Sequence, residues 1–516
     1  MNRRPNNDSA DNKATVCKLD RRHIAYALLA ILGLKLVILL LDPNPRFFLW
    51  DSVTYLRGAI DGTLPRDRSF LYSLLIGAIA VPLHSLHALV IAQTLAGVAS
   101  AFFVYLIVRV FLNLRFEVAL LAGLLVAIEP GQLFYERMVM AEAFGSAIWL
   151  GFLVLVLAYV RDGRTVWLPA IAAAGILAVA FRLNGTAVVL LVAPCLPLWR
   201  AWFTTNGPQT ARERSTQRRR VALQLAVSIA MTFVLHVGYR HIVAEIAHTR
   251  PGYIGTEGLF LLGFTAPAVA ATDFDGTGCD PSVLNHVRAS LDDPRTREGQ
   301  LWGDGGLWAA MQRDCPNPEA AADVVAHRAS QRIFAKVLPM ALTTTAQYFD
   351  DAEATWRMDS DLGRKGKVPL ELIDPVRQYF SFDVKPIAFA DTITLLWFQH
   401  ARWWFTACFL LAPLVAIWLA MGLRRDASGP EARLLALVVL GLFFSQFLLS
   451  PIIAFRYLHP FPPLMLVCAA AILSRYFAGP GSLARACHEL PEASLDPLGR
   501  SRAPAGVPVG YRFSSR

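Results

Sequence analysis

The sequence predicts an all-α polytopic membrane protein, with about ten transmembrane helices and a mixed, mostly helical domain outside the membrane. Of its 516 residues, 55% are hydrophobic and 17% are charged, and the mean hydropathy is +0.43. A soluble domain carries about 25% charged residues. The apolar residues are also gathered into runs that approach the roughly 20 residues needed to cross a bilayer. This composition excludes disordered, collagen-like and disulfide-framework proteins.

The formal net charge of +10 would suggest nucleic acid on a soluble protein. On a membrane protein, the distribution of charge between the two faces matters instead. The stretch 241–400 contains 14 Lys and Arg against 21 Asp and Glu, a net charge of −7, which leaves +17 for the rest of the chain. We therefore interpret the charge as a topology signal and expect no nucleic-acid partner.

The first predicted span covers 24–41 and follows a basic tail, 1–23. Such a segment could be a signal peptide, but it ends in Asp42-Pro43-Asn44-Pro45 and has no small-residue cleavage site. We expect an uncleaved span with a cytosolic N-terminus.

A second apolar run, 70–83, has about 14 residues, which is typical of an interfacial or re-entrant segment. If it does not span, the later basic loops, including 200–220, face the cytosol; if it spans, they all face outward. The positive-inside rule favours the first arrangement, which predicts ten spans with both termini in the cytosol. The other nine are expected at 88–108, 117–135, 142–160, 167–181, 184–199, 221–240, 402–423, 432–450 and 458–475.

This topology divides the chain into a membrane module (24–240), an outer domain (241–401), C-terminal membrane helices (402–476) and a disordered cytosolic tail (477–516). Within the outer domain, apolar residues at helical spacing predict a helix over 318–349, kinked or divided at Pro339. Cys279 and Cys315 could form a disulfide if that compartment is oxidising.

Charged side chains at the outer membrane face are the candidates for chemistry, because charge is costly near lipid. Asp51 follows the first span among aromatic residues. Partial desolvation there would raise its pKa toward the range of a general base. Alternatively, Asp51 or Ser52 could be the N-cap of a helix that continues through Tyr55.

Three glutamates form a second group. Glu129 ends a predicted span beside the helix-breaking Pro130, Glu136 follows it, and Glu142 opens the next span. The helix dipole alone could account for Glu142, because an acid is favourable at a helix N-terminus. It does not account for Glu129.

Two arginines, Arg182 and Arg456, lie in predicted outer turns, against the positive-inside rule. A bidentate contact with a phosphate would explain their positions. An ion pair with Glu129 or Glu142 is the alternative.

Four short patterns, taken in order, resemble the GT-C superfamily of membrane glycosyltransferases, especially family 39 protein mannosyltransferases, aminoarabinose transferases and bacterial lipopolysaccharide glycosyltransferases. The first is Asp-Ser-x-x-Tyr-Leu after the first span, and the second is a short Arg and Tyr element. A proline-ended span that leads to an acid is the third, and Arg-Tyr-x-x-Pro before the last span is the fourth. These patterns correspond to Asp51, Ser52, Tyr55 and Leu56; Arg68 and Tyr72; Pro130 and Glu142; and Arg456, Tyr457 and Pro460.

The resemblance implies an inverting transfer of a sugar from a polyprenyl-phosphate donor to a glycan, lipid or protein acceptor, at the outer face of the cytoplasmic membrane. It assigns Asp51 to the acceptor hydroxyl and Glu142 to the second acidic position, with Glu136 and Glu129 as rivals. Substrate contacts are expected at Tyr55, Arg68 and Tyr72, and lipid-phosphate contacts at Arg456, Tyr457 and Arg182.

No cofactor is expected. Some relatives hold a divalent metal between their acidic loops, but Ser52 stands where several of them have Glu, so a metal is not favoured. A lipid or sugar transporter or flippase is the alternative class, although the sequence shows no inverted repeat. A structural subunit of a larger assembly is a third class of protein that the sequence allows.

Overall fold

The computed structural model describes residues 21–204, 210–350, 370–384, 392–399, 401–422, 429–449 and 455–477. The chain divides into two compact units, and the larger, Lys18–Arg475, contains these residues except the last two of the final helix. In the described part, the secondary structure is helical, and the single extended pairing is a bridge between Arg46 and Met138. The predicted all-α class is confirmed. The predicted tails lie almost entirely outside the described residues.

Seven described helices are long and apolar enough to cross a membrane, and they coincide with seven of the ten predicted spans. The other three predicted spans contain shorter apolar helices. The chain is therefore a multi-pass membrane protein. The long helices are α1 (Arg21–Leu41), α4 (Leu86–Leu106), α7 (Glu142–Asp162), α9 (Thr186–Thr204), α10 (Ala211–Ala247), α19 (Ala401–Gly422) and α20 (Gly429–Leu449), and the shorter ones are α5 (Phe116–Ala127), α8 (Trp167–Phe181) and α21 (Phe461–Phe477).

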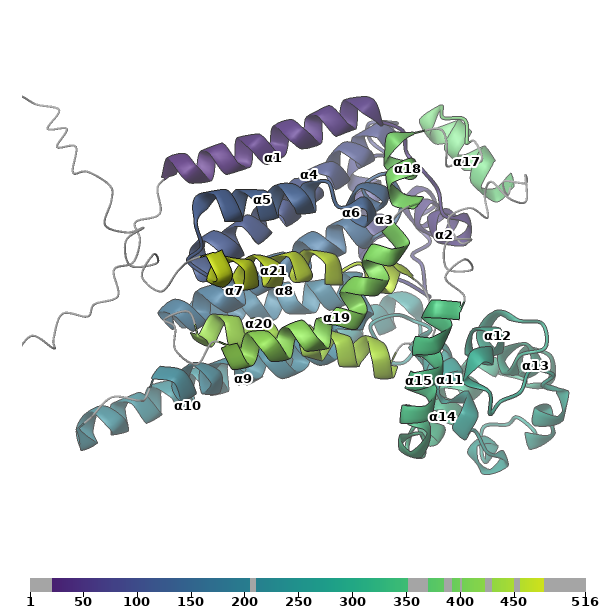
Figure 1. Ribbon diagram of the computed structural model, residues 1–516. Coiled ribbons are helices and arrows are strands. Elements are labelled where there is room, and N and C mark those ends of the chain that lie inside the picture. Colours follow the sequence, from purple (N-terminus) through teal and green to yellow (C-terminus); the bar gives the residue numbers. More distant parts are fainter. Residues whose placement is uncertain are drawn as a thin grey trace, which may run out of the picture. The chain divides into compact units, whose positions relative to one another are not determined.

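Figure 1 shows α4, α7, α8, α9 and α10 side by side, and α7 packs closely against both α4 and α8. Helix α1 buries one narrow face, because its buried residues, Ala27, Ile31 and Lys35, recur every fourth position. The remaining surface of α1 carries exposed leucines, as expected of a helix that faces lipid.

The predicted span 117–135 is divided into two helices. Helix α5 ends at Ala127, and α6 (Pro130–Tyr135) begins at the proline, whose missing N–H is tolerated at a first helical position. The run 70–83 forms α3 (Phe70–Ile79), a helix of 10 residues packed against α2 (Leu49–Ile60). Helix α10 continues to Ala247, past the predicted boundary at residue 240.

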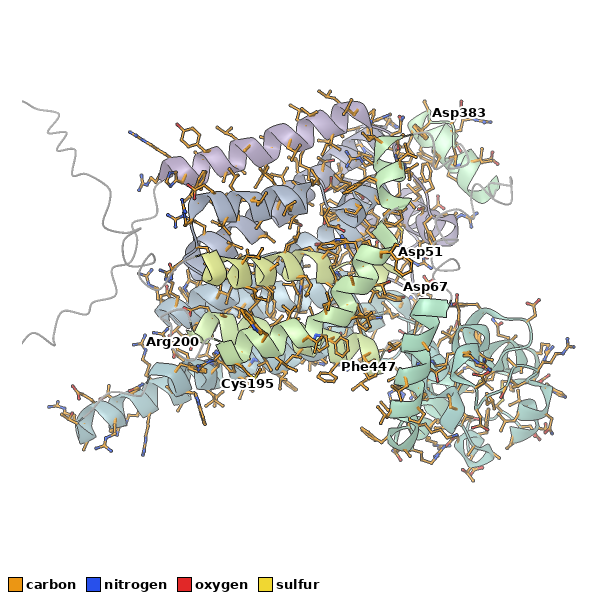
Figure 2. All side chains as sticks on the ribbon, viewed as in Figure 1. Asp51, Asp67, Cys195, Arg200, Asp383 and Phe447 are labelled. Carbon is orange, nitrogen blue, oxygen red and sulfur yellow. A yellow bond between two sulfur atoms is a disulfide. The ribbon has the colours of Figure 1, made fainter. Side chains whose placement is uncertain are left out.

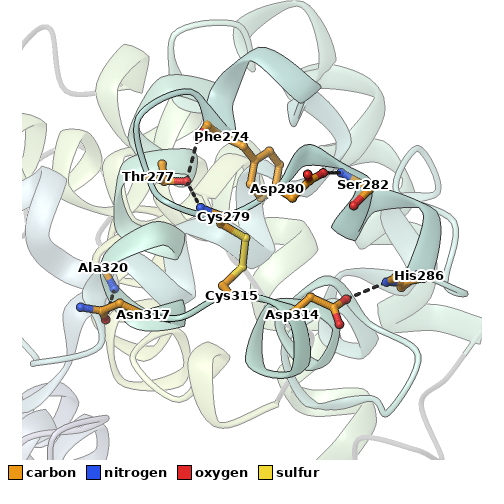
Figure 3. Close-up of a disulfide and its surroundings, with 10 residues drawn as sticks. All are labelled: Phe274, Thr277, Cys279, Asp280, Ser282, His286, Asp314, Cys315, Asn317 and Ala320. Carbon is orange, nitrogen blue, oxygen red and sulfur yellow. Dashed lines mark hydrogen bonds and ion pairs between the residues drawn. A yellow bond between two sulfur atoms is a disulfide. The ribbon is translucent and has the colours of Figure 1, made fainter.

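In the predicted outer domain, the described residues up to 350 include five α-helices, and three of them contribute to an apolar cluster that contains the disulfide between Cys279 and Cys315 (Figure 3). The five helices are α11 (Glu257–Thr265), α12 (Arg297–Trp302), α13 (Leu307–Asp314), α14 (Pro318–Ser330) and α15 (Phe334–Asp350). The predicted helix 318–349 is divided at 331–333, and not at Pro339, which lies inside α15. A proline disturbs the turn that precedes it, and here the break falls just before that turn.

Two further short helices, α17 (Leu370–Phe380) and α18 (Ile393–Gln399), lie in the last part of the predicted outer domain. Helix α17 contacts α2, and α18 contacts α6. Asp51 lies in α2 and Glu129 lies at the start of α6, so each of these short helices contacts a segment that carries a candidate residue.

Candidate active site

Helix α2 positions Asp51. Its N-cap is Phe48, whose side chain cannot cap, so neither Asp51 nor Ser52 has the N-cap position that the sequence left open. Ser52 instead accepts a hydrogen bond from the backbone N–H of Phe48 (2.8 Å) and donates one to the carbonyl of Val139 (3.0 Å). Asp51 thus lies in the first turn of a helix that is fastened to the second outer loop.

Asp51 forms an ion pair with Arg68, with 2.5 Å between Oδ1 and Nη1. The side chain of Asp51 is 15% exposed, and the Nε of Arg68 also donates to Asp67 at 3.0 Å. Burial opposes the charge on Arg68, but the two carboxylates outweigh it and raise the pKa of Arg68 above its ordinary value. Arg68 therefore remains a cation, and a cation stabilises the carboxylate form of its partner.

Two tyrosines extend the contacts of this ion pair toward the segment that contains Glu129, Glu136 and Glu142. The Arg68 guanidinium lies 5.6 Å from the ring centre of Tyr55, and the Tyr55 ring meets the Tyr72 ring edge-on at 4.7 Å. The Tyr72 hydroxyl donates to Gln93, whose amide in turn donates to the carbonyls of Glu136 and Met138. Tyr72 is fully buried and shares an apolar cluster with Tyr55 and with Phe181, the residue before Arg182, so both predicted halves of the site adjoin this cluster.

Glu142 opens α7 and forms an ion pair with Arg182, with 2.5 Å between Oε1 and Nη1. This is the ion-pair alternative that the sequence left open for Arg182. The pair lines a cavity of about 20 Å³, together with Asn184, Gly185 and His459. That volume holds about one water molecule. A sugar could enter only after these side chains have moved apart.

The loop before the last span closes the same cavity. The Arg182 guanidinium lies 5.3 Å from the ring centre of Tyr457, and Asn184 donates to the carbonyl of Tyr457 (3.3 Å). Arg456 lies beside it in the 3₁₀ turn η7 (Phe455–Leu458), but its side chain is outside the described part of the structure. The structure therefore brings Glu142, Arg182 and Tyr457 together.

Glu129 and Glu136, the predicted rivals of Glu142, are absent from the lining of this cavity. Glu129 caps α6 by accepting a hydrogen bond from the backbone N–H of Gln132 (2.6 Å). Glu136 is fully buried in ion pairs with Lys35 and Arg137, the second at 2.9 Å. Both acids hold the second outer loop in place.

A buried charge network, which the sequence reasoning did not identify, extends from this point. Asp42 pairs with Arg46 (2.5 Å) and accepts a hydrogen bond from Thr394, which precedes the C-terminal spans. Arg137 donates to the carbonyl of Asp42 (3.1 Å), and the bridge between Arg46 and Met138 joins the two loops. One signal was available in the sequence: Lys35 interrupts an apolar span, and a charge within a span points to a partner or a function.

No group of three or more His, Cys, Asp or Glu side chains that could hold a metal ion occurs within the described ranges. The site brings together acidic, guanidinium and phenolic groups instead. Such groups can accept a proton from a hydroxyl and can stabilise an anionic phosphate.

No protein-family model matches the sequence, and no curated protein matches it either. One solved structure similar to this chain is that of ArnT from Cupriavidus metallidurans bound to undecaprenyl phosphate. The sequence identity is 14%, the alignment covers 89% of this chain and 79% of that one, and the TM-score is 0.31.

Proposed function

We propose that this protein is a membrane glycosyltransferase of the GT-C type, which transfers a sugar from a polyprenyl-phosphate donor to an acceptor hydroxyl at the outer membrane face. One observation carries the proposal. The acid after the first span and the acid that opens α7 each pair with an arginine, and Tyr55 and Tyr72 belong to an apolar cluster that reaches Phe181, beside the second arginine. These are positions at which the sequence resembles that superfamily.

The proposed reaction uses Asp51 as the base. Its carboxylate takes the proton from the acceptor hydroxyl, and the oxygen then forms a bond to the anomeric carbon of the sugar. The bond between this carbon and the polyprenyl-phosphate oxygen breaks on the opposite side, so the configuration inverts and the electron pair leaves with the phosphate. The reaction needs no outside oxidant or reductant.

Arg182 is proposed to stabilise the negative charge of the leaving phosphate. It lies between Glu142 and Tyr457, so it can exchange a carboxylate partner for a phosphate with a small movement. Glu142 and Tyr457 then position this guanidinium. Arg456 in η7 is a second candidate for a phosphate contact. That no metal is needed stays a prediction.

The test uses the purified protein with a panel of polyprenyl-phosphate sugars, and release of the free lipid phosphate is measured. The proposal predicts release with at least one donor in the presence of an acceptor, and none when Asp51 is replaced by Asn. Flux of the lipid or sugar across liposomes without any release would favour a transporter or flippase. If loss of all these charges has no effect on either assay, the protein is a structural subunit.

A further inference from the structure

A second, larger cavity lies between the end of α9 and the start of α10. Its volume is about 540 Å³, which is within the range of small-ligand sites. Arg200 lies in its wall, and Figure 2 shows Arg200 and Asp51 at opposite ends of the long helices. Helix α7, which begins at Glu142 and ends at Asp162, spans the distance between the two cavities.

Positive charge dominates this groove. Arg200, Arg212 and Arg220 line it, and the single carboxylate among its lining residues is that of Glu213. Glu213 is already engaged, because it completes a capping box with Thr210 (Oε2 to Oγ1, 2.9 Å). The groove therefore presents three guanidinium groups with one neutralising acid in its own wall.

Two of these arginines are held in place by the end of α7. Arg220 donates to the carbonyl of Gly163 (3.1 Å), and Arg200 donates to the carbonyl of Val160. The guanidinium of Arg200 thus lies near that of Arg220, with Asp162 and Glu431 as nearby acids.

Exposed apolar residues mark the depth of the groove in the bilayer. Trp202 on α9 is 77% exposed and Leu223 on α10 is 64% exposed, and each lies within one helical turn of a groove residue. Tryptophan is enriched where lipid tails meet headgroups. Helix α10 has 37 residues, about 55 Å, so its basic first turns extend beyond the membrane. Arg200 and Arg220 lie beside these residues, at the level of the headgroups, and Arg212, in the first turn of α10, lies farther from the membrane centre.

We propose that this groove binds the phosphate of an anionic phospholipid headgroup, in the leaflet opposite the candidate active site. Guanidinium groups suit a phosphodiester, and Thr216 and Gln217 line the same wall. A headgroup bound there would hold α9 and α10 together. The proposal does not depend on which reaction the outer site catalyses.

The test compares Arg212→Gln with Arg214→Gln in the full chain, purified in neutral detergent. Both arginines are exposed on α10, but only Arg212 lines the groove. Native mass spectrometry measures the binding of phosphatidylglycerol, with phosphatidylcholine as the neutral-lipid control and inorganic phosphate as the soluble competitor. Loss of Arg212 should weaken phosphatidylglycerol binding about fivefold, and loss of Arg214 should leave it unchanged.

Three results would overturn the proposal. Equal weakening in both variants would mean general attraction to a basic helix. Equal binding of the two lipids to the unmodified protein would mean that the net negative charge of the headgroup is not recognised, since phosphatidylcholine carries the same phosphodiester. If inorganic phosphate binds in an Arg212-dependent way while phosphatidylglycerol does not, the groove belongs to a soluble phosphate and not to a lipid. Neither variant touches the outer site, so these outcomes are separate from those of the glycosyltransfer assay.

Discussion

Nη1 of Arg182 lies 2.5 Å from Oε1 of Glu142, so two residues 40 positions apart meet at the wall of one small cavity. In the predicted topology, the pair explains how an arginine is retained on the face that the positive-inside rule disfavours. In the structure, Glu142 pairs with the same guanidinium that we propose binds the donor phosphate. A donor phosphate must compete with Glu142 for the same guanidinium.

The first prediction concerns Asp51. Replacing Asp51 by Asn should lower the rate of lipid-phosphate release by about a hundredfold or more, because the acceptor hydroxyl loses its base. Asp67→Asn is the matched control, since Asp67 also pairs with Arg68. The control should keep most of the activity, and both variants should express normally. Full activity in the Asp51 variant would refute its assigned role.

The second prediction concerns the space beside Arg182. A Cβ atom on Gly145 would lie 2.8 Å from Cγ of Arg182, so Gly145→Ala should displace this side chain. We expect kcat/KM for the donor to fall by about tenfold to a hundredfold, because a displaced Arg182 would stabilise the leaving phosphate less well. Gly151→Ala on the same helix is the control, because it meets Phe103 instead. If both variants lose activity equally, general packing of α7 is responsible.

The third prediction concerns the ion pair of Lys35 and Glu136, whose side chains are both fully buried. Lys35→Met leaves a carboxylate without one of its two cationic partners and should lower the free energy of unfolding by about 3–5 kcal/mol. Adding Glu136→Gln should restore part of this loss, because Gln can still bond to Arg137. Thermal unfolding in detergent measures both variants. A single variant as stable as the unmodified protein would contradict the prediction.

The sequence predicted most of the membrane helices, because a span is a local property that composition reveals. It also predicted that Glu142 and Arg182 could pair, because topology placed both on one face. It did not predict the network of Lys35, Glu136 and Asp42, whose partners are far apart in the chain. Lys35 and Glu136, for example, are separated by 101 positions.

The division at Pro130 followed from proline chemistry, yet the helix that begins there is capped by Glu129, one of the predicted catalytic candidates. A carboxylate that caps a helix and one that binds substrate look alike in a sequence, since both favour an acid beside a break. Only the position of each side chain in space separates Glu129 from Glu142. Similarly, Ser52 looked like a possible N-cap, but its hydrogen bond to Val139 depends on a loop that folds back from far along the chain.

The disulfide between Cys279 and Cys315 allows the membrane topology to be tested in living cells. Thiols join in this way only where the surroundings are oxidising, so the bond records which compartment the domain entered during synthesis. A thiol-reactive dye that cannot cross membranes would label these two cysteines on intact cells only after reduction, if the domain lies outside. The same bond that stabilises the domain thus serves as a built-in marker of sidedness.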